Sequence, residues 1–559
     1  MEGDLMLGLL LSLVAGPEGG AQFVARELEV GGEIVVTRCG SPAKDFILEV
    51  NGGGLVAEDF DGDGHLDLVV VDGSDMEGAR AGRAGRPTRL FLGDGAGGFA
   101  AAGKAWAMSG GRWAMAGCAG DLNGDGFPDL FLTEWGRNRL YLNDGGRGFV
   151  DASLGVLGAD GELKPSGLDG ERWSTSACLF DYDGDGHLDI AVVNYLGFHL
   201  DELRGPGGGC TWKGFDVMCG PEGMIPVHDQ ILRGAGDGTF RDVSIEIGFH
   251  PEAACFGLGV VSLDYDGDGD SDLYISNDSM PNHLWENTGD GHFKEVGMRR
   301  GVSHDANGKE QAGMGIACAD VDGDGREDLF VTNFSGERNA FYRSSRATGF
   351  RERADVSRLG GVSIGRLGWG TALADFDLDG DLDLVVANGH VYPQADRAGT
   401  DTSYAQEDQF FRNDGTGRFT EEPLSGHGAG VSRALLAADW DEDGDLDLAL
   451  IQLDGAVLML ENQAPHGPQN HWLEVRLKGR GGNRFGVGAR VALESPGGAQ
   501  FAEMRTSAGY QAGCAAWLHF GLGTLEELQA LVVRWPSGRV QRIEAPALDQ
   551  RLVIWEAGE

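Results

Sequence analysis

The chain has 559 residues with 95 glycines, 17 prolines and a formal net charge of −44. This length allows two to four domains, and many glycines with little helical periodicity favour a β-rich fold with tight turns. The acidity argues against nucleic acid and anionic lipid as partners, because both are bound by basic patches.

The N-terminal segment, residues 1–21, is expected to be a secretory signal peptide. It contains an apolar run that is too short to cross a membrane. Glu2 and Asp4 stand in the region where such peptides carry Lys or Arg, so that region is atypical. No other stretch of the sequence is apolar enough for a membrane span. We therefore expect a secreted or extracellular protein, or one of the cell envelope.

An acidic phrase of nine residues occurs seven times along the chain. Every copy has an oxygen-bearing side chain at positions 1, 3, 5 and 9 and a glycine at position 6. We number the copies loop 1 to loop 7 in chain order. The candidate metal ligands are Asp59, Asp61, Asp63 and Asp67; Asp121, Asn123, Asp125 and Asp129; Asp181, Asp183, Asp185 and Asp189; Asp264, Asp266, Asp268 and Asp272; Asp320, Asp322, Asp324 and Asp328; Asp375, Asp377, Asp379 and Asp383; and Asp439, Asp441, Asp443 and Asp447.

Carboxylates at alternate positions of a tight turn converge on one point and repel one another unless a cation lies between them. Calcium takes six to eight oxygen ligands and is the usual ion for such a set. Position 7 has no consistent side chain, which fits a backbone carbonyl ligand there. The pattern predicts about seven calcium ions. Asn123 gives loop 2 one charge fewer than the others, so we expect loop 2 to bind calcium most weakly.

Two other interpretations of the loops compete with this one. An EF-hand loop requires Glu at position 12, but that position is apolar in all seven copies, from Val70 to Leu450. Each copy runs on into a short apolar stretch that is typical of a buried strand. The remaining alternative is seven Asp/Gly-rich turns without metal. Isolated turns do not require Asp at position 9, which favours calcium.

The loops recur every 55 to 83 residues, which indicates a repeated supersecondary unit. A second phrase follows each loop: an apolar strand, a glycine-rich turn and then Phe, as in residues 89–99, 139–149 and 283–293. Two hairpins per unit make a four-stranded sheet, and seven such sheets form a β-propeller over residues 22–465. The last repeat lacks its final strand, so residues 33–37 are predicted to complete the last blade.

The eight cysteines include no CxxC motif, which argues against zinc ribbons and thioredoxin-type chemistry. Cys118, Cys178 and Cys318 are interpreted as small buried hydrophobic residues. Cys210 and Cys219 bracket a short stretch of a Gly/Pro-rich insertion, and they are the best disulfide candidates in an exported protein.

After a proline-containing linker near residue 465, the remaining residues 466–559 alternate apolar and polar positions between glycine turns. This pattern predicts a small β domain, sandwich-like. The predicted fold is therefore all-β: a seven-bladed β-propeller followed by a small C-terminal β-sandwich-like domain.

The repeats resemble the FG-GAP/VCBS repeats found in integrin α-subunit heads and in many bacterial surface proteins. The tail resembles the ASPIC/UnbV domain in the stretches 483–490, 509–511, 518–523 and 533–538. Two insertions, at 210–221 and at 367–371 with 387–393, strengthen the resemblance, which covers nearly the whole chain after the signal peptide. It implies a secreted calcium-binding propeller with adhesive or ligand-binding roles and no assigned reaction.

Three hypotheses for the function follow. The first is a binding or adhesion module with structural calcium and an extracellular protein or glycan ligand. Trp369, His390 and Tyr392 are then the candidate ligand surface, unless they merely pack the blades. The second is a calcium-dependent polysaccharide lyase or hydrolase, although no catalytic motif is found. Gly361-Val-Ser363-Ile-Gly365 matches GxSxG only by spelling, since no strand-turn-helix is predicted there. The third is an envelope assembly component.

Overall fold

The computed structural model of the chain describes residues 21–108, 111–158, 161–346, 349–424, 426–464 and 469–558. The expected signal peptide lies almost entirely outside these residues. The described part is all-β, as predicted, with three short α-helices: α1 (Met76–Arg80), α2 (Gly297–Arg300) and α3 (Gly360–Ser363). None of its helices has the length and hydrophobicity that crossing a bilayer requires.

Every acidic loop joins the first two strands of a four-stranded antiparallel unit, and we number the units by their loops. Units 1 to 3 comprise β4 (Gly54–Glu58), β5 (Asp67–Val71), β6 (Arg89–Gly93) and β7 (Phe99–Ala101); β8 (Ala114–Gly120), β9 (Asp129–Gly136), β10 (Arg139–Asn143) and β11 (Phe149–Asp151); and β14 (Arg172–Phe180), β15 (Asp189–Gly197), β18 (Gln230–Gly234) and β19 (Phe240–Asp242).

Units 4 to 6 have the same order. They comprise β20 (Gly257–Leu263), β21 (Asp272–Asn277), β22 (His283–Asn287) and β23 (Phe293–Glu295); β24 (Ile316–Ala319), β25 (Asp328–Val331), β26 (Ala340–Ser345) and β27 (Gly349–Glu352); and β28 (Gly368–Ala374), β29 (Asp383–Asn388), β30 (Gln409–Asn413) and β31 (Phe419–Glu422). Unit 7 supplies three consecutive strands, β32 (Ser432–Ala438), β33 (Asp447–Gln452) and β34 (Val457–Asn462).

The units are arranged as in a β-propeller. The first strand of each unit contacts the first strand of the next, and β32 contacts β4, so the inner strands form a closed ring. These strands are mostly buried and are rich in Gly and Ala. Small side chains let neighbouring inner strands approach closely around the axis. The acidic loops therefore lie on one face of the ring, the loop face, and the connections between second and third strands lie on the other, the insertion face.

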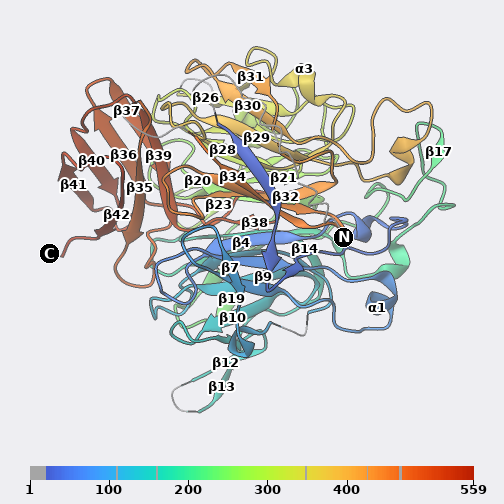
Figure 1. Cartoon of the computed structure of the whole chain (residues 1–559). Helices are drawn as coiled ribbons and strands as arrows, with labels where there is room; N and C mark the ends of the chain where they lie inside the picture. The colour runs from blue at the N-terminus through green and yellow to red at the C-terminus, as the bar shows by residue number, and fades with distance from the viewer. Residues whose placement is uncertain are drawn as a thin grey trace, which may run out of the picture.

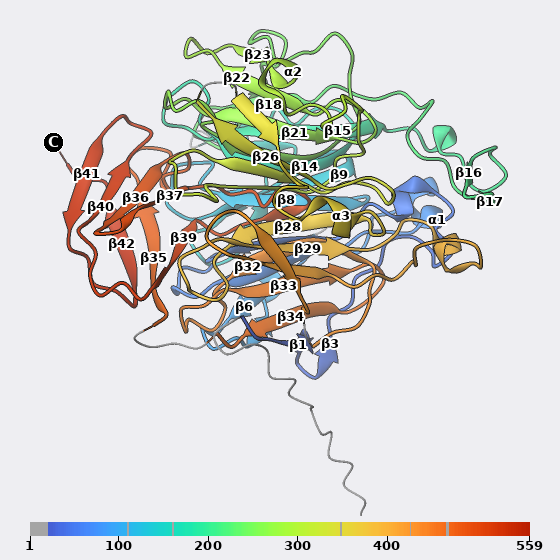
Figure 2. The same ribbon diagram turned by 90° about the horizontal axis from the view of Figure 1, so that it is seen from above.

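The strand that completes unit 7 is β1 (Phe23–Glu27), which pairs antiparallel with β34 (Figure 2). The prediction of residues 33–37 was wrong in detail: β3 (Glu33–Ile34) pairs with β2 (Glu29–Val30), and only Val36 bridges to Ala456. The sequence feature that marks β1 as the fourth strand is its first residue, Phe23. Phe23 lies opposite Asn462, the register that Phe149 has with Asn143 and Phe293 with Asn287.

The C-terminal residues form two sheets with a common core, as expected for a sandwich-like domain. We call residues 471–555 the tail domain. One sheet has the order β39-β35-β42, with β35 (His471–Lys478), β39 (Trp517–Gly523) and β42 (Gln550–Trp555). The other has the order β37-β36-β40-β41, with β36 (Arg490–Ser495), β37 (Gly498–Glu503), β40 (Ala530–Arg534) and β41 (Val540–Glu544). Figure 1 shows the tail domain on one side of the ring, and α1 and β17 (Phe215–Asp216) on the other.

Replacing Phe23 by Ala is expected to destabilise the fold by about 3–5 kcal/mol, the usual cost of emptying a buried aromatic site. Phe23 is 5% exposed and packs edge-to-face on Phe376 and Phe410 at 5.8 and 5.9 Å between ring centroids. Val24→Ala is the matched control, because that neighbour is 39% exposed. Urea unfolding of both variants provides the measurement, and equal midpoints would contradict the role of β1 in closing the ring.

Candidate metal centres

The backbone of the acidic loops has the conformation that the glycine pattern predicts. At position 6, φ lies between +81° in Gly325 and +102° in Gly444 in all seven loops. Side chains other than glycine rarely adopt this region, so the repeated glycine is a geometric requirement. Position 4 is also left-handed. It is Gly in five loops, but Leu378 and Glu442 hold φ values of 59° and 60° there.

The carboxylate at position 9 is buried and ties its loop to the sheet. In loop 1, Asp67 accepts the Phe60 N–H through Oδ2 at 2.9 Å and the Gly93 N–H, from the third strand, through Oδ1 at 3.0 Å. Asp129 accepts the Leu122 and Asn143 N–H groups in the same way. These two bonds fix the direction of each carboxylate and hold the loop over the end of its own sheet.

The end of the third strand also connects neighbouring units. The Asn143 side chain donates to the Phe60 carbonyl at 2.8 Å, which links unit 2 to the loop of unit 1. Asn287 and Asn462 make the same bond to position 2 of the preceding loop, at 2.8 and 2.7 Å. A loop that loses its shape would therefore disturb the adjacent unit as well as its own.

The predicted ligands converge in the structure. Carboxylate oxygens from positions 1, 3 and 9 lie within 4.8 Å of one another in loops 1, 3, 4 and 6, and those of positions 1, 3 and 5 do so in loop 5. Several buried oxygens have no hydrogen-bond donor, including Asp181 Oδ1, Asp377 Oδ1 and Asp383 Oδ2. Loop 2 keeps an oxygen at position 3, since Asn123 Oδ1 accepts only the Asp125 N–H, at 2.9 Å.

Burial makes these loops costly to keep charged. It raises the pKa of Asp67 to about 7 and that of Asp447 to about 9, with neighbouring aspartates as a lesser cause. A divalent cation would reverse this effect by stabilising the ionised carboxylates. The donor set, all oxygen with unpartnered buried atoms, therefore fits calcium, which the side chains of positions 1, 3, 5 and 9 would hold at each loop.

The tail domain lies against the loop face, which the sequence did not indicate. Arg476 contacts Asp59 of loop 1 at 3.3 Å, Arg490 contacts Asp264 of loop 4 at 3.1 Å, and Arg551 lies 3.8 Å from Asp439 of loop 7. Position-6 carbonyls accept further bonds: Gly380 O from Gln500 at 3.1 Å and Gly444 O from His519 at 2.9 Å. The loops therefore form a docking surface inside the molecule.

Residues 504–516, the channel segment, connect β37 and β39 of the tail domain and run inside the ring of inner strands. Its two-residue strand β38 (Ala512–Gly513) pairs parallel with β4, and Gly509 bridges to Val260 of β20. The Gln511 N–H donates to Ser176 Oγ of β14. A side chain on Gly509 would lie 2.1 Å from the Ile316 carbonyl, so only glycine fits at that point. The axis of the ring is thus occupied by the chain itself.

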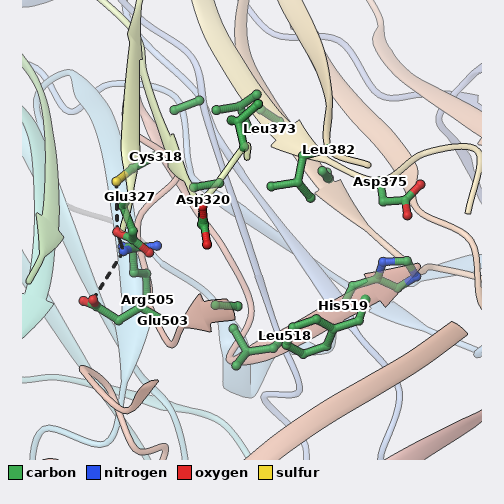
Figure 3. Close-up of a pocket in the computed structure, with 18 of the residues that line it drawn as sticks. Cys318, Asp320, Glu327, Leu373, Asp375, Leu382, Glu503, Arg505, Leu518 and His519 are labelled. Atoms are coloured by element: carbon green, nitrogen blue, oxygen red, sulfur yellow. Dashed lines mark hydrogen bonds and ion pairs between the residues drawn. The ribbon is translucent and has the colours of Figure 1, made fainter. Parts of the chain in front are cut away.

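A cavity of about 370 Å³ remains between the channel segment, the tail domain and loops 5 and 6. Figure 3 shows His519 and Leu518 of β39 on one side of it and Leu373 and Asp375 of the ring on the other. At its end, Arg505 pairs with Glu327 and lies 3.5 Å from Glu503, while Cys318 donates to Glu327 at 3.0 Å. Arg505 therefore joins the tail domain to unit 5.

Two of the three residues expected at a ligand surface are buried. Trp369 is 2% exposed and donates its indole N–H to the Gly389 carbonyl at 2.7 Å, and His390 is completely inaccessible. Trp369 belongs to a hydrophobic cluster around the axis on the insertion face, where Arg433 stacks 4.1 Å above its ring. The His390 ring lies 4.6 Å from that of Trp212 and 5.6 Å from that of Phe334, measured between centroids. Hydrophobic packing around the axis explains their burial. Tyr392 is partly exposed beside Trp212, with 5.6 Å between ring centroids.

The insertion that carries Trp212 contains a disulfide between Cys210 and Cys219, with 2.01 Å between the sulfur atoms. The bond closes a hairpin formed by β16 (Thr211–Trp212) and β17. Ser363, the central residue of the GxSxG match, lies in α3 and is 2% exposed. Its hydroxyl donates to the Gly360 carbonyl and accepts the Asn339 N–H.

A family model described as FG-GAP-like repeat matches residues 59–132, 121–192, 264–331 and 320–386, and one described as ASPIC and UnbV matches residues 479–559. The chain is 26% identical to cartilage acidic protein 1 of Xenopus tropicalis over 370 residues. This match covers 65% of the chain and 51% of that protein. The human protein of that name is 29% identical over 371 residues, covering 65% and 50%. The chain thus spans about half the length of the curated relatives it matches.

Solved structures resemble the fold more distantly. A lectin from Agrocybe aegerita that recognises non-reducing terminal N-acetylglucosamine is 17% identical, with a TM-score of 0.40 over 78% of this chain and 96% of its own. The BP39L lectin from Burkholderia pseudomallei is 12% identical, with a TM-score of 0.42 over 75% and 97%.

Removing calcium is expected to lower the melting temperature strongly. Each site that binds only the folded state contributes about 2.7 kcal/mol when calcium is a hundredfold above its Kd. Differential scanning calorimetry with excess calcium and with EDTA measures the shift, and magnesium alone is the matched control. Identical melting curves in calcium and EDTA would contradict a structural role of the metal.

Gly126→Ala in loop 2 is expected to destabilise the protein by about 1–2 kcal/mol, because φ is +93° and no atom lies near the added methyl group. Strain is then the only cost. Gly361→Ala in α3 also meets no neighbouring atom, and its backbone is helical, so it should be neutral or slightly stabilising. Chemical denaturation distinguishes the two, and equal effects would refute the conformational argument.

Proposed function

We propose that this chain, which consists of FG-GAP-like repeats followed by an ASPIC and UnbV domain, is an extracellular binding module whose seven units are the blades of one calcium-stabilised propeller. Its ligand is an extracellular protein or a glycan, bound on the insertion face. Calcium holds the acidic loops in shape and is not itself part of the ligand site.

The occupied loop face carries this proposal. The tail domain covers acidic loops on that side, and the channel segment fills the axis. The opposite face carries the three long connections between second and third strands, residues 72–88, 198–229 and 389–408. In Figure 1, α1 and β17 project there, on the side away from the tail domain. Variable loops on a rigid β scaffold are a common place for recognition.

The chemistry of the insertion face suits a binding surface. Arg80 lies 5.0 Å from the Phe46 ring and Arg112 4.9 Å from the Phe198 ring, while Lys213 lies 5.0 Å from Trp212. Aromatic residues and arginine are enriched in recognition interfaces. The disulfide at Cys210–Cys219 restricts the hairpin that presents Trp212, so less order is lost when a ligand binds.

Export is the second element of the proposal. A disulfide on an exposed insertion suits an oxidising compartment. Calcium sites of moderate affinity fill where the ion is plentiful, as it is outside the cell. The expected signal peptide would supply the route, although residues 1–20 lie outside the described part of the chain.

The double variant Cys210→Ser/Cys219→Ser is expected to lose at least about tenfold in affinity, because the freed hairpin must be ordered on binding. A glycan array and a panel of matrix proteins, in calcium, identify the ligand, and surface plasmon resonance measures the variants. Ile245→Ser is the matched control, since Ile245 is 78% exposed near the outer end of unit 3.

Undiminished affinity of the disulfide variant, together with loss of affinity in Ile245→Ser, would place the ligand elsewhere. Turnover of a polysaccharide on the array would favour the enzyme hypothesis instead. Saturable binding without turnover supports the binding module.

A further inference from the structure

One residue on the third strand of each unit lies next to the acidic loop of that unit. It directly precedes the residue whose N–H binds the position-9 aspartate, as Arg233 precedes Gly234 and Arg343 precedes Ser344. This position varies in charge around the ring. In order from unit 1 to unit 7 it is Leu92, Leu142, Arg233, Glu286, Arg343, Arg412 and Glu461.

In units 3 and 5 the arginine at this position enters the ligand set. Arg233 pairs with Asp183 at 2.6 Å and with Asp185 at 2.9 Å, which are positions 3 and 5 of loop 3. Arg343 pairs with Asp322 and, at 2.8 Å, with Asp328, which are positions 3 and 9 of loop 5. Each guanidinium thus binds two carboxylates that the pattern assigns to a metal ion.

Other arginines near the loops have carboxylate partners outside the ligand sets. Arg412 of unit 6 pairs with Glu422 at 2.8 Å. Arg476 pairs with Glu58 at 2.7 Å, and Arg551 pairs with Glu474 at 2.6 Å. Within the described residues, Arg233 and Arg343 differ from them because each pairs with two ligand aspartates of one loop. Arg490 pairs with one such aspartate, Asp264 of loop 4.

The geometry of loop 5 agrees with this difference. Its converging group consists of Asp320, Asp322 and Asp324, whereas loops 1, 3, 4 and 6 bring position 9 into the group. Arg326, at position 7 of loop 5, also pairs with Asp324. Two guanidinium groups therefore contact the ligand carboxylates of this one loop.

We propose that Arg233 and Arg343 are built-in cations that weaken calcium binding at loops 3 and 5, so that five sites fill at low calcium and two only at high calcium. The inference rests on the proposed calcium sites and specifies which of them differ. A cation entering loop 3 or 5 must displace a guanidinium from two carboxylates, and charge-assisted bonds of this kind are strong. We expect a loss of at least about tenfold in affinity.

This order differs from the expectation that loop 2 is weakest. Asn123 removes one charge from loop 2 but still offers an oxygen, and Leu142 beside it is uncharged. A guanidinium engages two ligand carboxylates at once. Loops 3 and 5 therefore rank below loop 2.

The test counts bound ions at defined free calcium. The full chain is dialysed against calcium buffers from about 1 µM to about 1 mM, in the range of protein calcium sites, and the ions are measured by mass spectrometry. The wild-type protein should bind two ions fewer than Arg233→Leu/Arg343→Leu at intermediate calcium and the same number at the highest calcium. Arg542→Leu in β41 of the tail domain is the matched control and should leave the titration unchanged, because Arg542 pairs with Glu494 and Glu544 and not with a loop aspartate.

A reciprocal variant protects the test against misfolding. Leu142→Arg places a guanidinium beside loop 2 and should move one ion from the tight to the weak class. Circular dichroism checks the fold of each variant. Seven equivalent sites with no effect of the arginine substitutions would overturn the inference while leaving the calcium proposal intact. Absence of calcium at every concentration would overturn both.

Discussion

Each unit of the ring is organised around a buried carboxylate whose direction is fixed by the backbone. In loops 1 to 4 and 7 the ninth residue accepts one N–H from the loop and one from the third strand, as Asp67 does from Phe60 and Gly93. In loops 5 and 6 it accepts the third-strand N–H. Where both oxygens are engaged, the loop, the second strand and the third strand cannot move independently. The price is a buried negative charge in every unit, which only a cation or protonation can relieve.

This constraint extends from single units to the whole molecule. Asn143, Asn287 and Asn462 bind the carbonyl at position 2 of the preceding loop, so the loops also connect neighbouring units. The tail domain then uses the same loops as its docking surface through Arg476, Arg490 and Arg551. The most repeated residues of the chain are therefore structural, which is why the proposed ligand site is in the insertions that interrupt the repeat.

The parts of the fold that depend on local chemistry could be predicted from the sequence. Position-6 glycines, hairpin phrases and the spacing of the loops are repeated, so seven copies support one interpretation. The pairing of Cys210 with Cys219 could be predicted because the two residues are close in the sequence. The closing strand was misplaced because β1 carries only one residue of the repeated phrase, Phe23. Burial of Trp369 and His390 could not be predicted, since it depends on contacts with Tyr510 and Arg433, which are distant in sequence.

The channel segment had no periodic signal, because β38 has two residues and no alternation. Its presence nevertheless constrains how the protein can be made. The inner strand β4 is bordered by β5, its sequence neighbour, and by β38, which follows the strands of all seven acidic-loop units in the chain. Likewise, β1 precedes all seven acidic loops in the chain but has its partner only when β34 of unit 7 has been made. A growing chain on the ribosome therefore carries an unpaired inner edge until all seven units have been made, and the ring can acquire its central contacts only after the channel segment has emerged.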